Sequence, residues 1–177
     1  MNNLEKIVYD KPEVTSWLNG MVAPLMDIVR DSSQLALIGI RRGGVDVGQY
    51  LYESLARKGV HFECEMGELN IAFYRDDFSS MGLHPVVGAS HVPFDVTEKH
   101  IILVDDVLGT GRTIRAAMNE IFDYGRPAKI TLAVLAQRTD SELPIRADVV
   151  GKNLSTKSNE YIDLDANQWQ VSVGVKS

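Results

Sequence analysis

The residues whose types and spacing most clearly indicate a chemical function follow a short apolar run in the middle of the chain. Residues 101–104 read Ile-Ile-Leu-Val, and Asp105 and Asp106 come directly after them, before a Gly/Thr-rich loop at residues 108–113. This pattern predicts a buried strand that delivers two carboxylates to a sheet edge, followed by a loop that opens a helix. The unpaired N–H groups and the positive dipole end of such a helix start attract a phosphate.

Two carboxylates beside a phosphate loop would repel a bare phosphate, so they need another partner. Ribose hydroxyls, which donate hydrogen bonds, and the hydration shell of Mg²⁺ are the natural candidates. The first inference is therefore a pocket for a phosphorylated sugar. A Walker A loop is absent, and Ile114 stands where a dinucleotide-binding loop has its third glycine. An acidic turn that caps an ordinary helix is the simpler alternative.

A second strand and loop carry positive charge instead. Residues 35–40 are apolar and run into Arg41, Arg42, Gly43 and Gly44. Paired arginines suit a dianionic phosphate, and glycines permit unusual backbone angles. Two solvated arginines would explain the charges equally well in isolation. Beside a second phosphate loop, however, the pair favours a diphosphate site.

Apolar spacing predicts the elements that must position these loops. Helical spacing runs from residue 12 to 30, where Pro24 should bend or divide the helix. A second helix should end near residue 57, and the helix after the phosphate loop should reach residue 122, with Gly125 as its C-cap. Residues 79–85 lack periodicity and are expected to form a mobile lid. Strands are expected at 35–40, 63–74 (as a strand or a hairpin), 92–96, from 100, and at 129–136, 149–150, 161–164 and 170–173.

Alternating strands and helices favour a right-handed parallel α/β sheet, with a small β-rich lobe made by the C-terminal end. Ligands of such sheets bind beyond the carboxyl ends of the strands. That edge is expected to gather charged side chains from separate loops, namely Arg41, Arg42, Arg75, Asp105, Asp106 and Arg138.

The overall composition is that of an ordinary globular domain. With 177 residues, 45% hydrophobic content and a single cysteine, Cys64, the chain can bury a core without disulfides. No run approaches a membrane span and the first residues do not resemble a secretion signal, so a cytoplasmic protein without membrane contact is expected. The net charge of −6 weighs against generic binding to nucleic acid, although it leaves room for a local basic patch.

The acidic strand end and its loop resemble a known motif. Val-Asp-Asp-Val-Leu-Gly-Thr-Gly-Arg-Thr at residues 104–113 is similar to the motif by which type I phosphoribosyltransferases bind 5-phosphoribosyl-1-diphosphate (PRPP). Longer matches, above all Tyr-Arg-Asp-Asp at 74–77 and Leu-Pro-Ile-Arg-Ala-Asp at 143–148, resemble the PyrR family. The resemblance implies a single domain over residues 1–177. Its core of parallel strands and flanking helices would span about 12–137, and a small β-rich hood would come from the N-terminal residues and about 138–177.

The PyrR resemblance also implies an activity and partners. Members are pyrimidine-operon attenuation regulators that also have uracil phosphoribosyltransferase activity. The expected substrates are uracil and PRPP, the products UMP and diphosphate, and the required ion Mg²⁺. A homodimer or higher oligomer is implied, as is binding to the leader of the pyrimidine operon mRNA.

The same resemblance assigns roles to individual residues. The loop before the helix would hold the 5′-phosphate, the two acids the ribose hydroxyls, and the arginine pair the diphosphate; the PRPP set is Arg41, Arg42, Val104, Asp105, Asp106, Val107, Leu108, Gly109, Thr110, Gly111, Arg112 and Thr113. The catalytic set is Asp105, Asp106, Arg75 on the closing lid, and Arg138 between base and diphosphate. The base would lie against Gln137, Val149, Val150 and Gly151. No side chain is expected to bind metal directly, since Mg²⁺ would arrive with PRPP near the two acids.

Three positions depart from the pattern associated with the family. Gly109 replaces a larger residue, often Tyr; Arg42 stands where Thr is usual; and Gln137 begins a Gln-Arg-Thr-Asp run in place of Asp-Arg-Gly-His. These departures bear on catalytic efficiency and on contacts to the base, while the expected fold is unaffected.

Three alternatives stay open. The first is an RNA-binding regulator with little or no catalysis, for which the exposed cations would be Arg126, Lys129, Arg146, Lys152 and Lys157. The second is a phosphoribosyltransferase for another base. The third is a receiver-type or phosphatase-like domain in which Asp105 or Asp106 accepts a phosphoryl group, which would leave the phosphate loop and the arginine pair unexplained.

Overall fold

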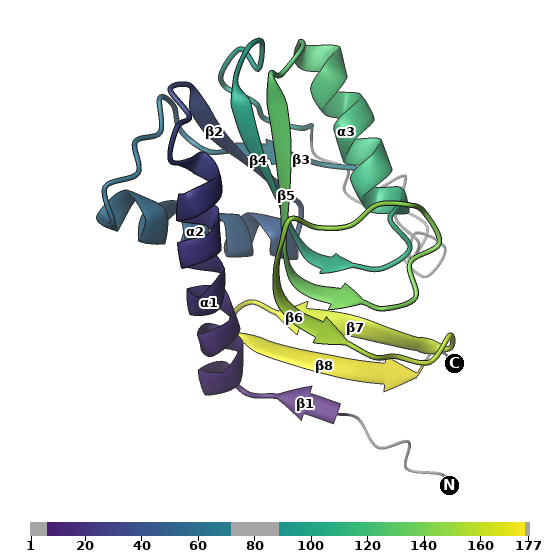
Figure 1. The fold of residues 1–177 in the computed structure, drawn as a ribbon. Helices are drawn as coiled ribbons and strands as arrows, with labels where there is room; N and C mark the ends of the chain where they lie inside the picture. The colour runs from purple at the N-terminus through teal and green to yellow at the C-terminus, as the bar shows by residue number, and fades with distance from the viewer. Residues whose placement is uncertain (1–6, 72–88, 176–177) are drawn as a thin grey trace, which may run out of the picture.

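Five parallel strands form the centre of the computed structural model, which describes residues 7–71 and 89–175. The strand order is β3-β2-β4-β5-β6, and a separate antiparallel sheet has the order β1-β8-β7 (Figure 1). The strands are β1 Ile7–Tyr9, β2 Leu35–Ile40, β3 Gly67–Leu69, β4 His100–Leu108, β5 Lys129–Arg138, β6 Val149–Leu154, β7 Glu160–Asp165 and β8 Gln170–Val175; the helices are α1 Lys11–Val29, α2 Gly43–Arg57 and α3 Arg112–Tyr124. The expected α/β fold with a small β-rich hood is confirmed.

Helices cover both faces of the parallel sheet. Leu35 and Leu37 of β2 pack in a core with α1 and α2, whereas Ala36 and Ile38 of the same strand pack in a second core with α3. Figure 1 shows α1 and α2 on one side of the sheet and α3 on the other. Because β2 is buried on both faces, all of its positions are apolar, which explains why its sequence lacks alternation.

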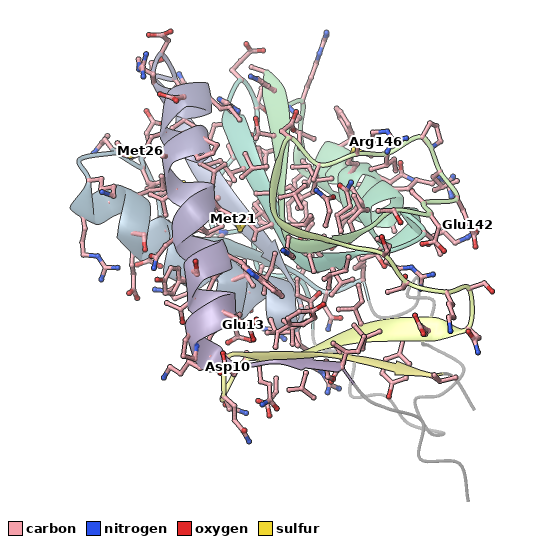
Figure 2. All side chains as sticks on the ribbon, turned by 60° about the horizontal axis from the view of Figure 1, so that its bottom comes forward. Asp10, Glu13, Met21, Met26, Glu142 and Arg146 are labelled. Carbon is pink, nitrogen blue, oxygen red and sulfur yellow. The ribbon has the colours of Figure 1, made fainter. Side chains whose placement is uncertain are left out.

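The first helix is continuous, although Pro24 was expected to bend or divide it. A capping box opens α1: the Asp10 side chain accepts from the Glu13 N–H, and the Glu13 carboxylate accepts from the Asp10 N–H (Figure 2). Pro24 removes only the hydrogen bond to the carbonyl of Gly20, and both residues are exposed. Water can therefore satisfy that carbonyl, and the buried side of the helix continues unchanged.

The segment between α2 and β4 has less strand than expected. Within residues 63–71 only β3 is a strand, and it pairs parallel with β2. The edge strand expected at residues 92–96 was wrong: the one pairing there is a bridge between His91 and Glu68. Pro93 lacks a backbone donor and so cannot extend that pairing. The predicted lid at 79–85 and Arg75 lie outside the described residues.

The hood is made by both ends of the described chain. The short strand β1 pairs antiparallel with β8, which pairs with β7. The expected boundary near residue 137 placed Val149–Leu154 in the hood, but this strand, β6, pairs parallel with β5 as the fifth strand of the central sheet. In residues 7–71 and 89–175, none of the helices has the length and apolarity that crossing a membrane requires.

Candidate phosphoribosyl site

The carboxyl ends of β2, β4 and β5 bring the predicted loops to one edge of the sheet. Gly39 of β2 is level with Val104 of β4, and Leu108 of β4 is level with Gln137 of β5. The loop after β2 therefore lies next to the acidic end of β4. This is the arrangement that the strand-and-loop pattern predicted.

The two acids lie within β4 and not in the loop after it. Asp105 is only 2% exposed, and its Oδ1 accepts a hydrogen bond from the Asp106 N–H at 2.9 Å. Asp106 is half-buried, and its Oδ1 accepts from the Val107 N–H at 2.8 Å. These backbone hydrogen bonds fix the orientation of both carboxylates at the end of the strand.

Two glycines allow the arginine loop to touch these acids. A Cβ on Gly43 would lie 2.3 Å from Asp106 Oδ2, and a Cβ on Gly44 would lie 2.7 Å from the Val104 carbonyl oxygen. Any larger residue would push the start of α2 away from β4. The peptide bond between Arg41 and Arg42 directly before them is cis. The close approach places the predicted diphosphate loop against the predicted ribose acids.

Two further acids border the site, and sequence reasoning missed both. Asp46 lies in the first turn of α2, and its pKa is raised, first by burial and then by the negative charges of Asp106 and Glu68. Glu68 lies on β3 and forms an ion pair with Arg41, with 2.7 Å between Oε2 and Nη2. Asp46 follows the arginine loop already assigned to this edge, whereas Glu68 lies within the strand expected at 63–74 and no local pattern marks it.

The phosphate loop ends in a left-handed glycine. Gly111 is the N-cap of α3 with a φ of +94°, and a Cβ there would lie 3.2 Å from Leu143 Cβ. Thr110 Oγ1 accepts a hydrogen bond from the Arg112 N–H at 3.2 Å. A residue in this conformation at a helix start helps successive N–H groups form a concave anion site.

The 139–148 loop, which joins β5 to β6, lies against the phosphate loop. The Leu143 N–H donates to the Thr110 carbonyl oxygen at 2.9 Å. Because the C=O and N–H of a trans peptide point in opposite directions, this contact turns the Gly111 N–H away from Leu143. An exposed ion pair between Arg112 and Glu142, 3.1 Å apart, joins the same two loops. Figure 2 shows Glu142 and Arg146 together on this loop, well away from α1.

Arg138, at the end of β5, reaches toward the hood. Its guanidinium donates to both carboxylate oxygens of Asp140, and also to the carbonyls of Glu160 and Lys157 at 2.7 and 3.3 Å. The pKa of Asp140 is lowered chiefly by its hydrogen bond with Arg138. These contacts join the carboxyl edge of the central sheet to the start of β7. The predicted place of Arg138 between base and diphosphate stays a prediction.

The residues expected to contact the base have different environments. The Gln137 side chain accepts a hydrogen bond from the Ala147 N–H at 3.2 Å. Val149 is buried in the core beside α1, whereas Val150 is half-buried on the other face and is level with Asp105 through Val134 of β5. A Cβ on Gly151 would lie 2.6 Å from the Leu135 carbonyl. The Val149 side chain is therefore packed inside, and Val150 is the better placed of the two valines to face a ligand.

The donor set fits Mg²⁺ carried by a substrate. In the described part of the chain, no group of three or more His, Cys, Asp or Glu side chains could hold a metal ion. Asp105 and Asp106 nevertheless offer adjacent carboxylates at the sheet edge. Mg²⁺ commonly keeps several waters and binds one or two carboxylates together with substrate phosphates.

A parallel sheet with a phosphate loop after an acidic strand, an arginine loop beside it and a hood defines the phosphoribosyltransferase class. Residues 20–174 match the family model described as a phosphoribosyl transferase domain. Solved structures show the same fold: hypoxanthine phosphoribosyltransferase from Trypanosoma cruzi has a TM-score of 0.71 at 18% identity, covering 98% of each chain, and the enzyme from Staphylococcus aureus has a TM-score of 0.69 at 14% identity, covering 100% of this chain and 98% of that one.

Curated relatives narrow the class further. The bifunctional protein PyrR of Elusimicrobium minutum is 42% identical over 94% of this chain and 92% of its own length. That of Nitrosococcus oceani is 53% identical over 76% of this chain and 75% of its own length. The chain therefore belongs to the PyrR family of phosphoribosyltransferases.

Proposed function

We propose that this protein transfers the phosphoribosyl group of PRPP to uracil, producing UMP and diphosphate in the cytoplasm. The observation that carries the proposal is the contact between the Gly43-Gly44 loop and the two acids of β4, beside the phosphate loop. These three features match the three parts of PRPP: a diphosphate, a ribose with two hydroxyls, and a 5′-phosphate.

In this proposal each part of PRPP has its own protein group. The backbone of Leu108 to Thr113, with the hydroxyls of Thr110 and Thr113, binds the 5′-phosphate, and the carboxylates of Asp105 and Asp106 accept hydrogen bonds from the ribose hydroxyls. Arg41 and Arg42 neutralise the diphosphate. Mg²⁺, when bound with PRPP, supplies further positive charge to the leaving diphosphate. Uracil lies toward Val150, two strands from Asp105 in the register of the sheet.

The reaction breaks the bond between ribose C1′ and the diphosphate oxygen and forms a bond from C1′ to uracil N1, which loses its proton. Positive charge develops on the ribose and negative charge on the leaving group in the transition state. The acids beside the ribose and the arginines beside the diphosphate stabilise these charges, and binding both substrates together removes the entropic cost of their encounter. No covalent nucleophile is needed.

The direct test is the formation of UMP from uracil and PRPP, with hypoxanthine and orotate as competing bases. We expect turnover with uracil and little with the other two. Preferential use of hypoxanthine or orotate would support a phosphoribosyltransferase for a different base. No turnover with any base, together with retained RNA binding, would support the regulator alone.

We also propose that the protein binds the leader of its pyrimidine operon mRNA as a homodimer or higher oligomer. Support comes from the family and from the exposure of all five candidate cations, which are Arg126, Lys129, Arg146, Lys152 and Lys157. A gel-shift titration with that leader RNA, with and without UMP, tests the binding, and sedimentation measures the oligomer. Absence of a shift at low salt would contradict the RNA role.

A further inference from the structure

The side chain of Arg41 is held by a carboxylate on the neighbouring strand. Glu68 Oε2 accepts a hydrogen bond from Arg41 Nε at 2.8 Å and lies 2.7 Å from Arg41 Nη2. The two side chains are 40% and 29% exposed, so the pair is only partly screened by water.

The backbone around Glu68 is paired on both sides. Glu68 lies beside Gly39 of β2, and its own N–H and C=O exchange hydrogen bonds with His91 at 2.7 and 2.8 Å. The Arg41 N–H donates to the Leu69 carbonyl at 2.8 Å. The carboxylate of Glu68 therefore acts from a rigid support, and Arg41 is joined to β3 by both its main chain and its side chain.

Two other carboxylates lie close to the loop that carries this arginine. Asp106 lies against Gly43, two residues after Arg41, and Asp46 lies one turn further into α2. The negative charges of Asp106 and Glu68 both raise the pKa of Asp46. An arginine released from Glu68 would be drawn to Asp106, which the proposed function assigns to the ribose.

We propose that Glu68 is a positioning residue, which holds Arg41 at the sheet edge in the orientation that receives the diphosphate and keeps it away from Asp106. This inference rests on the proposed function. It assigns to β3 a part in binding PRPP, although Glu68 itself need not touch the substrate.

The sign of the effect of Glu68→Gln distinguishes positioning from simple electrostatics. Glu68 is negative, so removing its charge would by itself strengthen the binding of an anion. If positioning dominates, the same change weakens the binding. We expect the KM for PRPP and the Kd for inorganic diphosphate to rise by roughly three- to tenfold, with a smaller change in kcat.

Three further variants complete the experiment. Glu68→Asp keeps the charge and should recover part of the affinity. Arg41→Lys should remove most of the effect of Glu68→Gln, because the two changes disrupt one interaction. Asp27→Asn removes the same charge from an exposed ion pair with Arg30 on α1, and it should leave both constants unchanged. Thermal unfolding of each variant checks that the fold persists.

Calorimetry with diphosphate needs no turnover, so it tests the inference even if uracil is not the substrate. Unchanged or tighter diphosphate binding by folded Glu68→Gln would overturn the positioning role. Weaker binding with no rescue by Glu68→Asp and no dependence on Arg41 would also overturn it. Absence of UMP formation by the unaltered protein would overturn the proposed function alone.

Discussion

Two glycines of the phosphate loop differ in whether the structure can accommodate a side chain at their position. Gly111 has a φ of +94° and a would-be Cβ only 3.2 Å from Leu143, whereas a Cβ on Gly109 would meet, among residues 7–71 and 89–175, only Arg138 Cδ at 3.7 Å. These described residues therefore do not require glycine at position 109.

This contrast predicts different outcomes for two alanine variants. Gly111→Ala should lower the free energy of unfolding by about 1–2 kcal/mol, because a left-handed conformation strains any Cβ, and it should also weaken PRPP binding. Gly109→Ala should change the free energy of unfolding by no more than about 0.5 kcal/mol. Urea unfolding measures both. Equal losses in the two variants would contradict the assigned backbone geometry.

Asp106 should matter more in the transition state than in the ground state. Asp106→Asn keeps the size of the side chain and an oxygen acceptor for the Val107 N–H but removes the negative charge near the ribose. We expect kcat to fall by about 10²-fold or more while the KM for PRPP changes less. Steady-state kinetics measure both, and an unchanged kcat would count against the assigned role.

At the scale of elements, the 139–148 loop contacts the phosphate loop at the Thr110 carbonyl oxygen, which accepts from the Leu143 N–H and from the Ser141 hydroxyl. Replacing Leu143 by its α-hydroxy acid changes the amide to an ester and removes only the N–H that donates to Thr110. The KM for PRPP should rise by about fivefold, which corresponds to the net free energy that one hydrogen bond contributes. The same replacement at Val60, whose N–H donates to Leu55 at the far end of α2, is the control. Equal KM values for the two esters would exclude the positioning role of the loop.

Most elements could be predicted because the pattern of buried positions repeats along each of them. The apolar runs of β2, β4 and β5 reflect strands that are covered on both faces, and Gly125 correctly indicated where α3 ends. The segment at 92–96 was mistaken because apolar residues such as Val96 can be buried from a loop as well as from a strand. Likewise, no periodicity marks β6 as a member of the central sheet rather than of the hood.

Only part of the candidate site could be predicted from the sequence, because some of its residues are defined by partners that are distant in the chain. The rule that ligands bind beyond strand carboxyl ends placed Arg41, Asp105 and Asp106 at one edge without any coordinates. Glu68 and Leu143 gain their roles from neighbours 27 and 33 residues away, Arg41 and Thr110, so no local pattern could indicate them.

At the scale of the whole molecule, a buried histidine links stability to pH. His100, at the start of β4 and 7% exposed, shares hydrogen bonds with the hydroxyls of Ser32 and Thr131 at 2.6 and 2.7 Å. Its pKa is lowered, first by burial and then by the positive charge of Lys129. The folded state therefore favours the neutral ring.

A lowered histidine pKa means that the folded protein binds a proton less readily than the unfolded chain. The stability that this provides is complete above 6.5, the ordinary pKa of a histidine side chain, and is lost as the pH falls below that value. Urea unfolding of the protein and of His100→Gln at pH 7.5 and 5.0 isolates this contribution from that of the acids. The unaltered protein should lose more stability between the two pH values than His100→Gln does. An equal loss would show that His100 does not contribute.

The hood joins the earliest and the latest parts of the described chain, and this sets the order in which the two sheets can form during synthesis. β1 leaves the ribosome long before its partner β8, because the whole central sheet lies between them in the chain. The central strands β2 to β6 can pair while β1 waits, because their contacts are complete by residue 154. The nascent protein would therefore pair its central strands first and complete the hood only after β8 has been made.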